Sequence, residues 1–172
     1  MRAPRGTTLI ELIVVLAVGT IIALAIAIPT FMMYSRARAA RDAADSLAQD
    51  LALLERTAQN GVAQQGATLE IDSLSPLVYS CYHGRPADLD PNTMLGTLIV
   101  QRTFVDVSLG AGPINAATPL LFASNGSAQY FDGTRWVDQH GPPVTFVLSP
   151  DTDPAHPVNV TLNLFTGEVS AP

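Results

Sequence analysis

The chain has 172 residues, 48% of them hydrophobic, with nine arginines, no lysine and fifteen acidic residues, for a net charge of −6. From Gly61 onward only Arg85, Arg102 and Arg135 oppose ten acidic residues, which disfavours direct nucleic-acid binding because phosphate recognition depends on clustered basic groups. Cys81 is the only cysteine, so it has no disulfide partner within the chain, and its apolar surroundings predict a buried thiol.

An apolar run from Leu9 to Ile28 precedes Pro29. Its twenty residues would form a helix about 30 Å long, which matches the hydrocarbon core of a bilayer. The only ionisable side chain in the run is Glu11. A carboxylate costs about 2.5–3.5 kcal/mol at the centre of a bilayer and less near its surface. The run therefore predicts a membrane-spanning helix whose single carboxylate has a functional reason to be there.

The stretch Gly6-Thr7-Thr8-Leu9-Ile10-Glu11-Leu12, preceded by a short segment containing Arg2 and Arg5, resembles the amino terminus of type IV pilins and pseudopilins. The resemblance implies that residues 1–6 are a leader, which prepilin peptidase removes after Gly6. It also implies that Thr7 becomes the methylated amino terminus. Thr7 stands where phenylalanine is commonest in the family, which tolerates the change.

The same resemblance implies a role for Glu11 in assembly. In the family, this glutamate meets the terminal amine of a neighbouring subunit, so that two groups that are each costly in an apolar medium neutralise each other. Pro29, which lies one position further from Glu11 than usual, is expected to kink the helix without ending it. The implied partners are prepilin peptidase, other pilin subunits and the bacterial inner membrane, with the head outside the cytoplasm before assembly into a filament.

Two simpler interpretations of the apolar run remain. A plain membrane anchor would explain the hydrophobicity but would need neither Gly6 nor Glu11. A secretory signal peptide cut near Ala37-Arg38-Ala39 would satisfy the small-residue rule, although its apolar core would be unusually long and Arg36 would precede the cut. Charge does not decide the orientation, because arginines flank the run on both sides.

A second, amphipathic helical segment is predicted after the anchor. Apolar residues recur there at steps of three and four, while charged residues, among them Asp50, mostly occupy the other faces. The pair Asn60-Gly61 predicts the end of the helix. The stripe comprises Ala40, Ala44, Leu47, Leu51, Leu54 and Ala58. The predicted organisation is a leader over 1–6, a membrane or filament-core helix over 7–33, an amphipathic helix over 34–60 and a head over 61–172.

The head shows short apolar or alternating runs separated by turn residues, which predict strands. The resulting fold class is α+β, with a long helix packed on a mainly antiparallel β head. In residues 97–109 one face is expected to be shared, with a bulge or turn between its members, by Leu98, Val100, either Thr103 or Phe104, Val105 and Val107. Asn125-Gly126 predicts a hairpin, and residues 132–135 predict another turn. Strands are expected within 68–71, 77–82, 97–109, 120–123, 128–131, 136–137, 144–148 and 158–164.

Two segments of the head resemble one particular class within the pilin and pseudopilin family. The run Leu120 to Ala128, with Phe122 before an Asn-Gly turn, and the run Val158 to Val169, which closes around Gly167, are similar to the GspH/FimT class of minor pilins and pseudopilins. Some FimT proteins implicated in DNA uptake carry arginines around the final glycine. Here Glu168 follows Gly167, which further disfavours a DNA receptor.

The sequence contains no recognisable catalytic set. The Gly-x-Ser-x-Gly and His-Glu-x-x-His motifs and a phosphate-binding loop are missing. A Cys81/His83 pair lacks further zinc ligands, and the acidic pairs Asp88/Asp90 and Asp151/Asp153 are expected to be solvated turns rather than calcium sites. No enzyme activity, cofactor or metal is predicted. The predicted function is that of a minor pilin or pseudopilin of a type IV pilus or type II secretion system. The alternative is a component of DNA uptake in competence, or a membrane-anchored binding protein.

Overall fold

The computed structural model describes residues 9–60, 66–84, 96–115, 118–131, 136–137, 141–151 and 154–171, apart from the side chains of residues 33, 36 and 37. The chain forms two compact units, Met1–Ser35 and Arg36–Pro172. The leader with Gly6 and Thr7, the C-cap residue Gly61 and the turn over 132–135 lie outside the described residues. The predicted division of the chain at residues 6, 33 and 60 therefore stays a prediction.

The first unit contains the amino-terminal part of helix α1 (Leu9–Asn60). Residues Leu9–Met32 are long and apolar enough to cross a membrane, with a mean hydropathy of 2.8 and none of the window buried. Pro29 lies inside α1. The hydroxyl groups of Thr20 and Thr30 donate hydrogen bonds to the carbonyl oxygens of Leu16 and Ile26, so both polar side chains are satisfied within the helix. The surface over residues 9–32 is therefore almost wholly apolar.

The second unit is built on the remaining part of α1. All six residues of the predicted apolar stripe are at most 2% exposed, and α1 ends at Asn60, as the sequence predicts. The helical period places these side chains on one face, because residues three and four apart lie above one another. That face is covered by the β-strands of the head, whereas Leu53, on another face of α1, remains 42% exposed.

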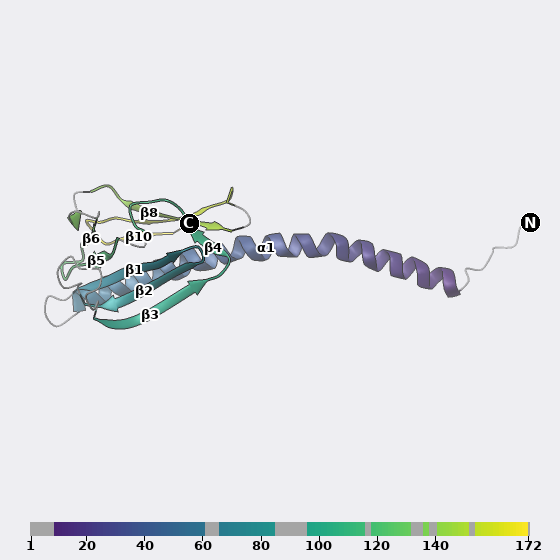
Figure 1. Cartoon of the computed structure of the whole chain (residues 1–172), viewed down its shortest axis with the longest axis horizontal. Helices are drawn as coiled ribbons and strands as arrows, with labels where there is room; N and C mark the ends of the chain where they lie inside the picture. The colour runs from purple at the N-terminus through teal and green to yellow at the C-terminus, as the bar shows by residue number, and fades with distance from the viewer. Residues whose placement is uncertain are drawn as a thin grey trace, which may run out of the picture. The chain divides into compact units, whose positions relative to one another are not determined.

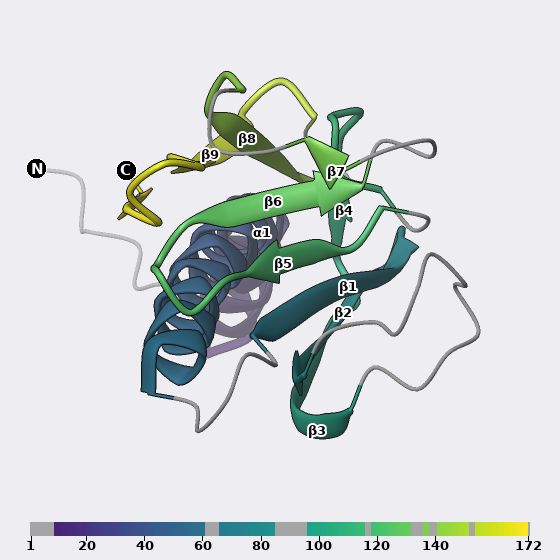
Figure 2. The same cartoon turned by 90° about the vertical axis from the view of Figure 1, so that its left-hand side faces the viewer.

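In the described part of the head, ten strands form two antiparallel sheets, as the fold class predicted (Figure 1). The six-stranded sheet has the order β3-β2-β1-β5-β6-β7, and the four-stranded sheet has the order β10-β9-β8-β4. Figure 2 shows strands of both sheets arranged around α1 within the head. The bounds are β1 (Ala67–Leu74), β2 (Leu77–His83), β3 (Thr97–Phe104), β4 (Val107–Leu109), β5 (Leu120–Phe122), β6 (Ala128–Phe131), β7 (Trp136–Val137), β8 (Val144–Pro150), β9 (Val158–Leu162) and β10 (Val169–Ser170).

The predicted hairpin at Asn125-Gly126 is confirmed. β5 and β6 pair in antiparallel register, with Leu120 opposite Tyr130, and Gly126 adopts a φ of 84° in the turn. Asn125 stabilises this turn, because its side-chain oxygen accepts hydrogen bonds from both the backbone N–H and the hydroxyl group of Ser127.

The prediction of one shared apolar face over residues 97–109 is wrong. β3 and β4 belong to different sheets, and the turn at 105–106 separates them. Val107, in the second sheet, is fully buried, whereas Leu98 is 51% and Val105 is 72% exposed. The alternation of apolar and polar residues correctly predicted a strand. However, β3 lies at the edge of its sheet and is little covered, and an alternating pattern does not reveal whether a strand lies at an edge.

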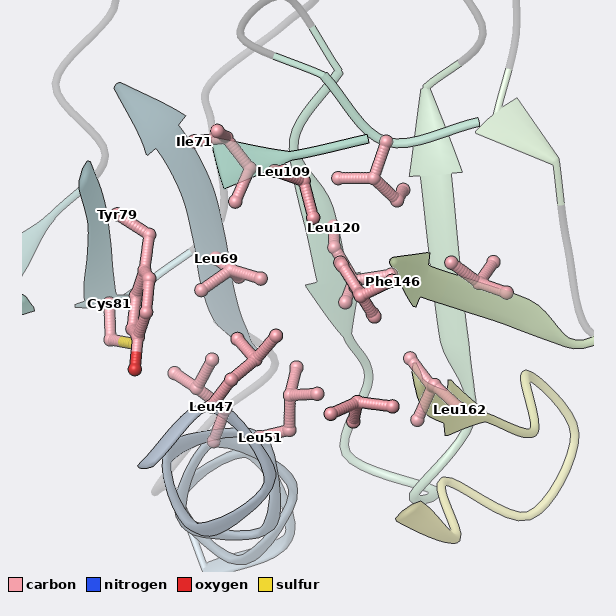
Figure 3. Packing of buried hydrophobic residues seen from close by; sticks show 14 of the residues in the cluster. Leu47, Leu51, Leu69, Ile71, Tyr79, Cys81, Leu109, Leu120, Phe146 and Leu162 are labelled. Atoms are coloured by element: carbon pink, nitrogen blue, oxygen red, sulfur yellow. The ribbon is translucent and has the colours of Figure 1, made fainter. Parts of the chain in front are cut away.

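The core lies between α1 and the inner faces of the two sheets (Figure 3). Leu47 and Leu51 project from the helix toward Leu69 and Tyr79 of the first sheet and toward Leu162 of the second. A core shared by three layers binds the helix to the head, because removing α1 would expose both sheets to water. The largest fully buried side chains are Tyr79, Phe122, Phe146, Leu47, Leu51, Leu54, Leu69, Ile71, Leu77, Leu120, Leu148 and Leu162.

Candidate assembly site

Glu11 lies in the first turn of α1 as the structure describes it. A carboxylate at this position interacts favourably with the positive end of the helix dipole, which is worth about 0.3–1 kcal/mol at an exposed site. Its apolar neighbours are open: Leu9 is 78%, Ile10 is 70% and Leu12 is 56% exposed. Glu11 is therefore displayed on a bare apolar helix, a position suited to a contact made with lipid or with another helix.

One face of the same helix carries a shallow groove lined mostly by small or slender side chains. Gly19, Ala23 and Ala27 recur at steps of four, and a Cβ atom added to Gly19 would meet nothing within 4 Å. Small residues at this spacing let helices in an apolar medium approach closely. The other residues that line the groove are Val15, Leu16, Thr20 and Leu24.

A buried carboxylate fastens α1 to the first sheet. Asp50 is 4% exposed and accepts a 2.9 Å hydrogen bond from the hydroxyl group of Tyr79 on β2. From the edge strand β3, Arg102 reaches the same carboxylate, with Nε 3.1 Å from Oδ2 and Nη2 3.4 Å from Oδ1. A buried charge is tolerated only when it is paired and hydrogen-bonded, and both conditions hold here.

The pKa values of the groups in this cluster are shifted by burial and by the carboxylate of Asp50. Burial, followed by the charge and hydrogen bond of Asp50, raises the pKa of Tyr79 above its ordinary range. Burial also raises the pKa of the Cys81 thiol to about 12. The hydrogen bond to Asp50, and then its charge, raises the pKa of Arg102. Tyr79 and Cys81 therefore stay neutral, and the ion pair carries the only formal charges of the cluster.

The sequence pattern did not predict this cluster, because Asp50 was expected among the charged residues on the other faces of the helix. One signal could have found it: Asp50 is three residues after Leu47 and four before Leu54, which puts it on the buried face of the helix. Arg102 gave no comparable signal, since its side chain is still 46% exposed and its partner lies 52 residues away.

We expect the substitution Arg102→Met to lower the free energy of unfolding by about 1.5–3 kcal/mol, because it leaves a buried carboxylate with only Tyr79 as a partner. Urea unfolding of the detergent-solubilised chain would measure this loss. Arg38→Met is the matched control: Arg38 lies 3.8 Å from Asp42, but both side chains are well exposed, so a loss of no more than about 0.5 kcal/mol is expected. Equal losses in the two variants would show that the Asp50 pair contributes no more than a surface pair.

Two glycine turns abut the last turns of α1. Gly126, between β5 and β6, and Gly167, between β9 and β10, both have positive φ angles. A Cβ atom on Gly167 would lie 2.5 Å from the carbonyl oxygen of Gly126 and 2.9 Å from Cδ of Glu55, and one on Gly126 would lie 2.7 Å from Nε2 of Gln59. At Gly167 the backbone oxygen leaves no room for a Cβ atom, whereas at Gly126 the nearest atom belongs to a flexible side chain and the positive φ favours glycine.

The remaining candidates behave as ordinary structural residues. Cys81 is fully buried and free, as predicted. Among the described residues, no group of three or more His, Cys, Asp or Glu side chains could hold a metal ion. Asp88, Asp90 and Asp153 lie outside the described residues, and Asp151 is an exposed turn residue. The candidate site therefore consists of the amino-terminal helix with Glu11, and of the contacts that fix α1 in the head.

The comparisons with known proteins bear on the amino terminus. No curated protein and no solved structure matches the chain significantly. Residues 1–27 match the family described as the prokaryotic N-terminal methylation motif. This motif marks substrates of prepilin peptidase that assemble with other pilins, and together with the apolar helix it fits anchoring in the inner membrane. The match, which covers residues 1–27, supports a type IV pilin-like substrate of prepilin peptidase.

Proposed function

We propose that this chain is a minor pilin or pseudopilin, a structural subunit of a type IV pilus or of a type II secretion pseudopilus. In this proposal, prepilin peptidase removes residues 1–6 and methylates Thr7, and Glu11 then positions the subunit against its neighbour. The observation that carries the proposal is the uncovered apolar helix with one carboxylate in its first turn, within the matched methylation motif.

The energetics of assembly favour this role for Glu11. Moving the apolar helix from lipid into a bundle of like helices changes its hydrophobic free energy little, because lipid tails are as apolar as leucine. Two contributions are then left to favour assembly. One is close packing along the face of Gly19, Ala23 and Ala27, and the other is the neutralisation of Glu11 by an amine.

The two glycine turns support assignment to the GspH/FimT class within this function. The Asn-Gly turn after β5 and the turn around Gly167 are the segments that resemble that class. Near the end of α1, the first packs against Gln59 and Glu55, and the second packs against Glu55. The glycines that carry the resemblance are thus the residues that allow these turns to approach α1.

The described part of the head disfavours direct DNA binding. Arg102 is engaged with the buried Asp50, while Glu70 and Asp72 project from the outer face of β1. An arginine that neutralises a buried carboxylate has little charge left to offer a phosphate. A role in DNA uptake would then be exercised through assembly with other subunits rather than through this head.

Mass spectrometry of the chain purified from its own cells tests the proposal. We expect the mature polypeptide to begin at Thr7 with one added methyl group, and to retain residues 1–6 when prepilin peptidase is deleted. A mature chain that begins at Met1, or one cut near Ala40 as a signal peptide would be, contradicts the proposal.

A further inference from the structure

Two exposed large apolar side chains lie close together at one end of the head. Val105, in the turn between β3 and β4, is 72% exposed, and Leu74, beside the turn between β1 and β2, is 36% exposed next to the exposed Pro76. The two turns are neighbours, because Leu74 pairs with Leu77, which in turn pairs with Phe104. We call Leu74, Pro76 and Val105 the apolar rim.

Within the head, the turns that carry the apolar rim follow β1 and β3 and lie at the end where α1 begins its contact with the strands (Figure 1). At the opposite end, Gly126 and Gly167 pack against Gln59 and Glu55, near the end of α1. Halfway along, Tyr79 on β2 reaches Asp50. The strand β1 therefore runs back along α1, and its last residue, Leu74, lies toward the Ala40 end of the helix.

The covalent chain limits how far this end of the head can be from a membrane. The apolar span ends at Met32, the exposed Tyr34 follows it, and the first buried residue of the head is Ala40. Eight helical residues cover about 12 Å, whichever direction they take. The polar interface of a bilayer extends about 5–8 Å beyond the hydrocarbon core, and aromatic side chains such as Tyr34 favour that level.

We propose that, before assembly, the apolar rim rests in the lipid interface of the membrane that holds the helix. The inference rests on the proposed membrane-anchored form and adds a second contact between subunit and bilayer. Exposed Val105 and Leu74 remove apolar area from water when they enter the interface.

The charges near this end do not select for anionic lipids. Arg38 and Arg41 on α1 are exposed, and so are Asp42 on the helix, Asp72 before Leu74, and the hydrogen-bonded neighbours Asp106 and Asp151. Because these acidic groups outnumber the two arginines, the apolar contact is the main attraction. The proposed contact is therefore not weakened by salt, unlike the binding of a basic patch to phosphate headgroups.

Site-specific fluorescent labels on the full chain test the proposal. The variants Val105→Cys and Phe165→Cys are labelled with an environment-sensitive maleimide dye and reconstituted into vesicles of phosphatidylethanolamine with a minority of phosphatidylglycerol. Phe165 is the matched control, because it is 64% exposed and adjoins the Gly167 turn at the opposite end of the head. Cys81 is fully buried, so the unmodified chain controls for background labelling.

We expect lipids that carry a nitroxide near the top of the acyl chain to quench the label at position 105 but not the label at 165, at both low and high salt. Flotation of the vesicles reports the membrane anchoring separately. If both labelled chains float and position 105 is no more quenched than 165, the apolar rim does not touch lipid, and the inference is overturned while the anchoring stands. A label at 105 that is shielded from aqueous iodide but unquenched by lipid would show contact with another subunit, which also overturns it. Chains that fail to float overturn both the anchoring and this inference.

Discussion

A chain carrying Glu11→Ala is expected to enter the membrane as well as the wild type does and to be lost from filaments. The substitution removes the only ionisable side chain of the apolar span, so insertion becomes easier. In the filament, however, it would leave the terminal amine of a neighbour unpaired in apolar surroundings. Removing one partner of a buried ion pair costs about 3–5 kcal/mol, which corresponds to a loss of about a hundredfold or more in the assembly equilibrium.

The measurement compares the amount of chain in the sheared filament fraction with the amount in the membrane fraction. Gly6→Ala serves as the control for processing, since it should retain the leader and its higher mass, whereas Glu11→Ala should be cut normally. Glu11→Gln separates charge from shape, because the amide keeps a hydrogen-bond acceptor without the negative charge. Wild-type amounts of Glu11→Ala in the sheared fraction would rule out the proposed role of the carboxylate.

The second large effect is expected for Gly167→Val, which should destabilise the head by about 2–5 kcal/mol. The φ angle of 73° costs a residue with a side chain about 1–2 kcal/mol. Overpacking adds about 1–3 kcal/mol, because the new Cβ atom would lie 2.5 Å from a backbone oxygen, which cannot move away as a flexible side chain can. Such a loss is a large part of the stability of a typical domain.

Urea unfolding of the solubilised chain, followed by near-ultraviolet circular dichroism, measures this loss. Gly112→Ala is the matched control, since the added Cβ atom would meet only the carbonyl oxygen of Thr145 at an ordinary 3.5 Å, so a change within about 0.5 kcal/mol is expected. Combining Gly167→Val with Glu55→Ala should recover only part of the loss, because the clash with the carbonyl oxygen of Gly126 remains. Full recovery would show that the clash with the Glu55 side chain causes the whole loss of stability.

Local patterns in the sequence were sufficient to predict the helix and most strands. The stripe from Ala40 to Ala58 is a property of helical period, and the turn at Asn125-Gly126 is a property of two residues that tolerate positive φ. Both features depend on neighbours in the sequence. They could therefore be predicted without knowledge of the tertiary fold.

The features that the sequence did not reveal depend on distant residues. The exposed position of β3 follows from its place at the edge of the sheet, which the alternation of Leu98, Val100 and Arg102 does not encode. The pairing of Asp50 with Arg102 required the antiparallel register of β2 and β3, which sets Arg102 opposite Tyr79. The roles of Gly6, Thr7 and Glu11 came from resemblance, since no contact within a single subunit reveals a partner that arrives only in assembly.

The seating of α1 between two sheets has a mechanical consequence for a subunit held by its amino-terminal end. The buried side chains from Ala40 to Ala58 and the Asp50 ion pair all lie along the axis of the helix. Tension applied at Arg36 would load these contacts in shear, so that they yield together rather than peeling apart one after another. The same packing that excludes water thus lets the head resist a pulling force applied through the helix.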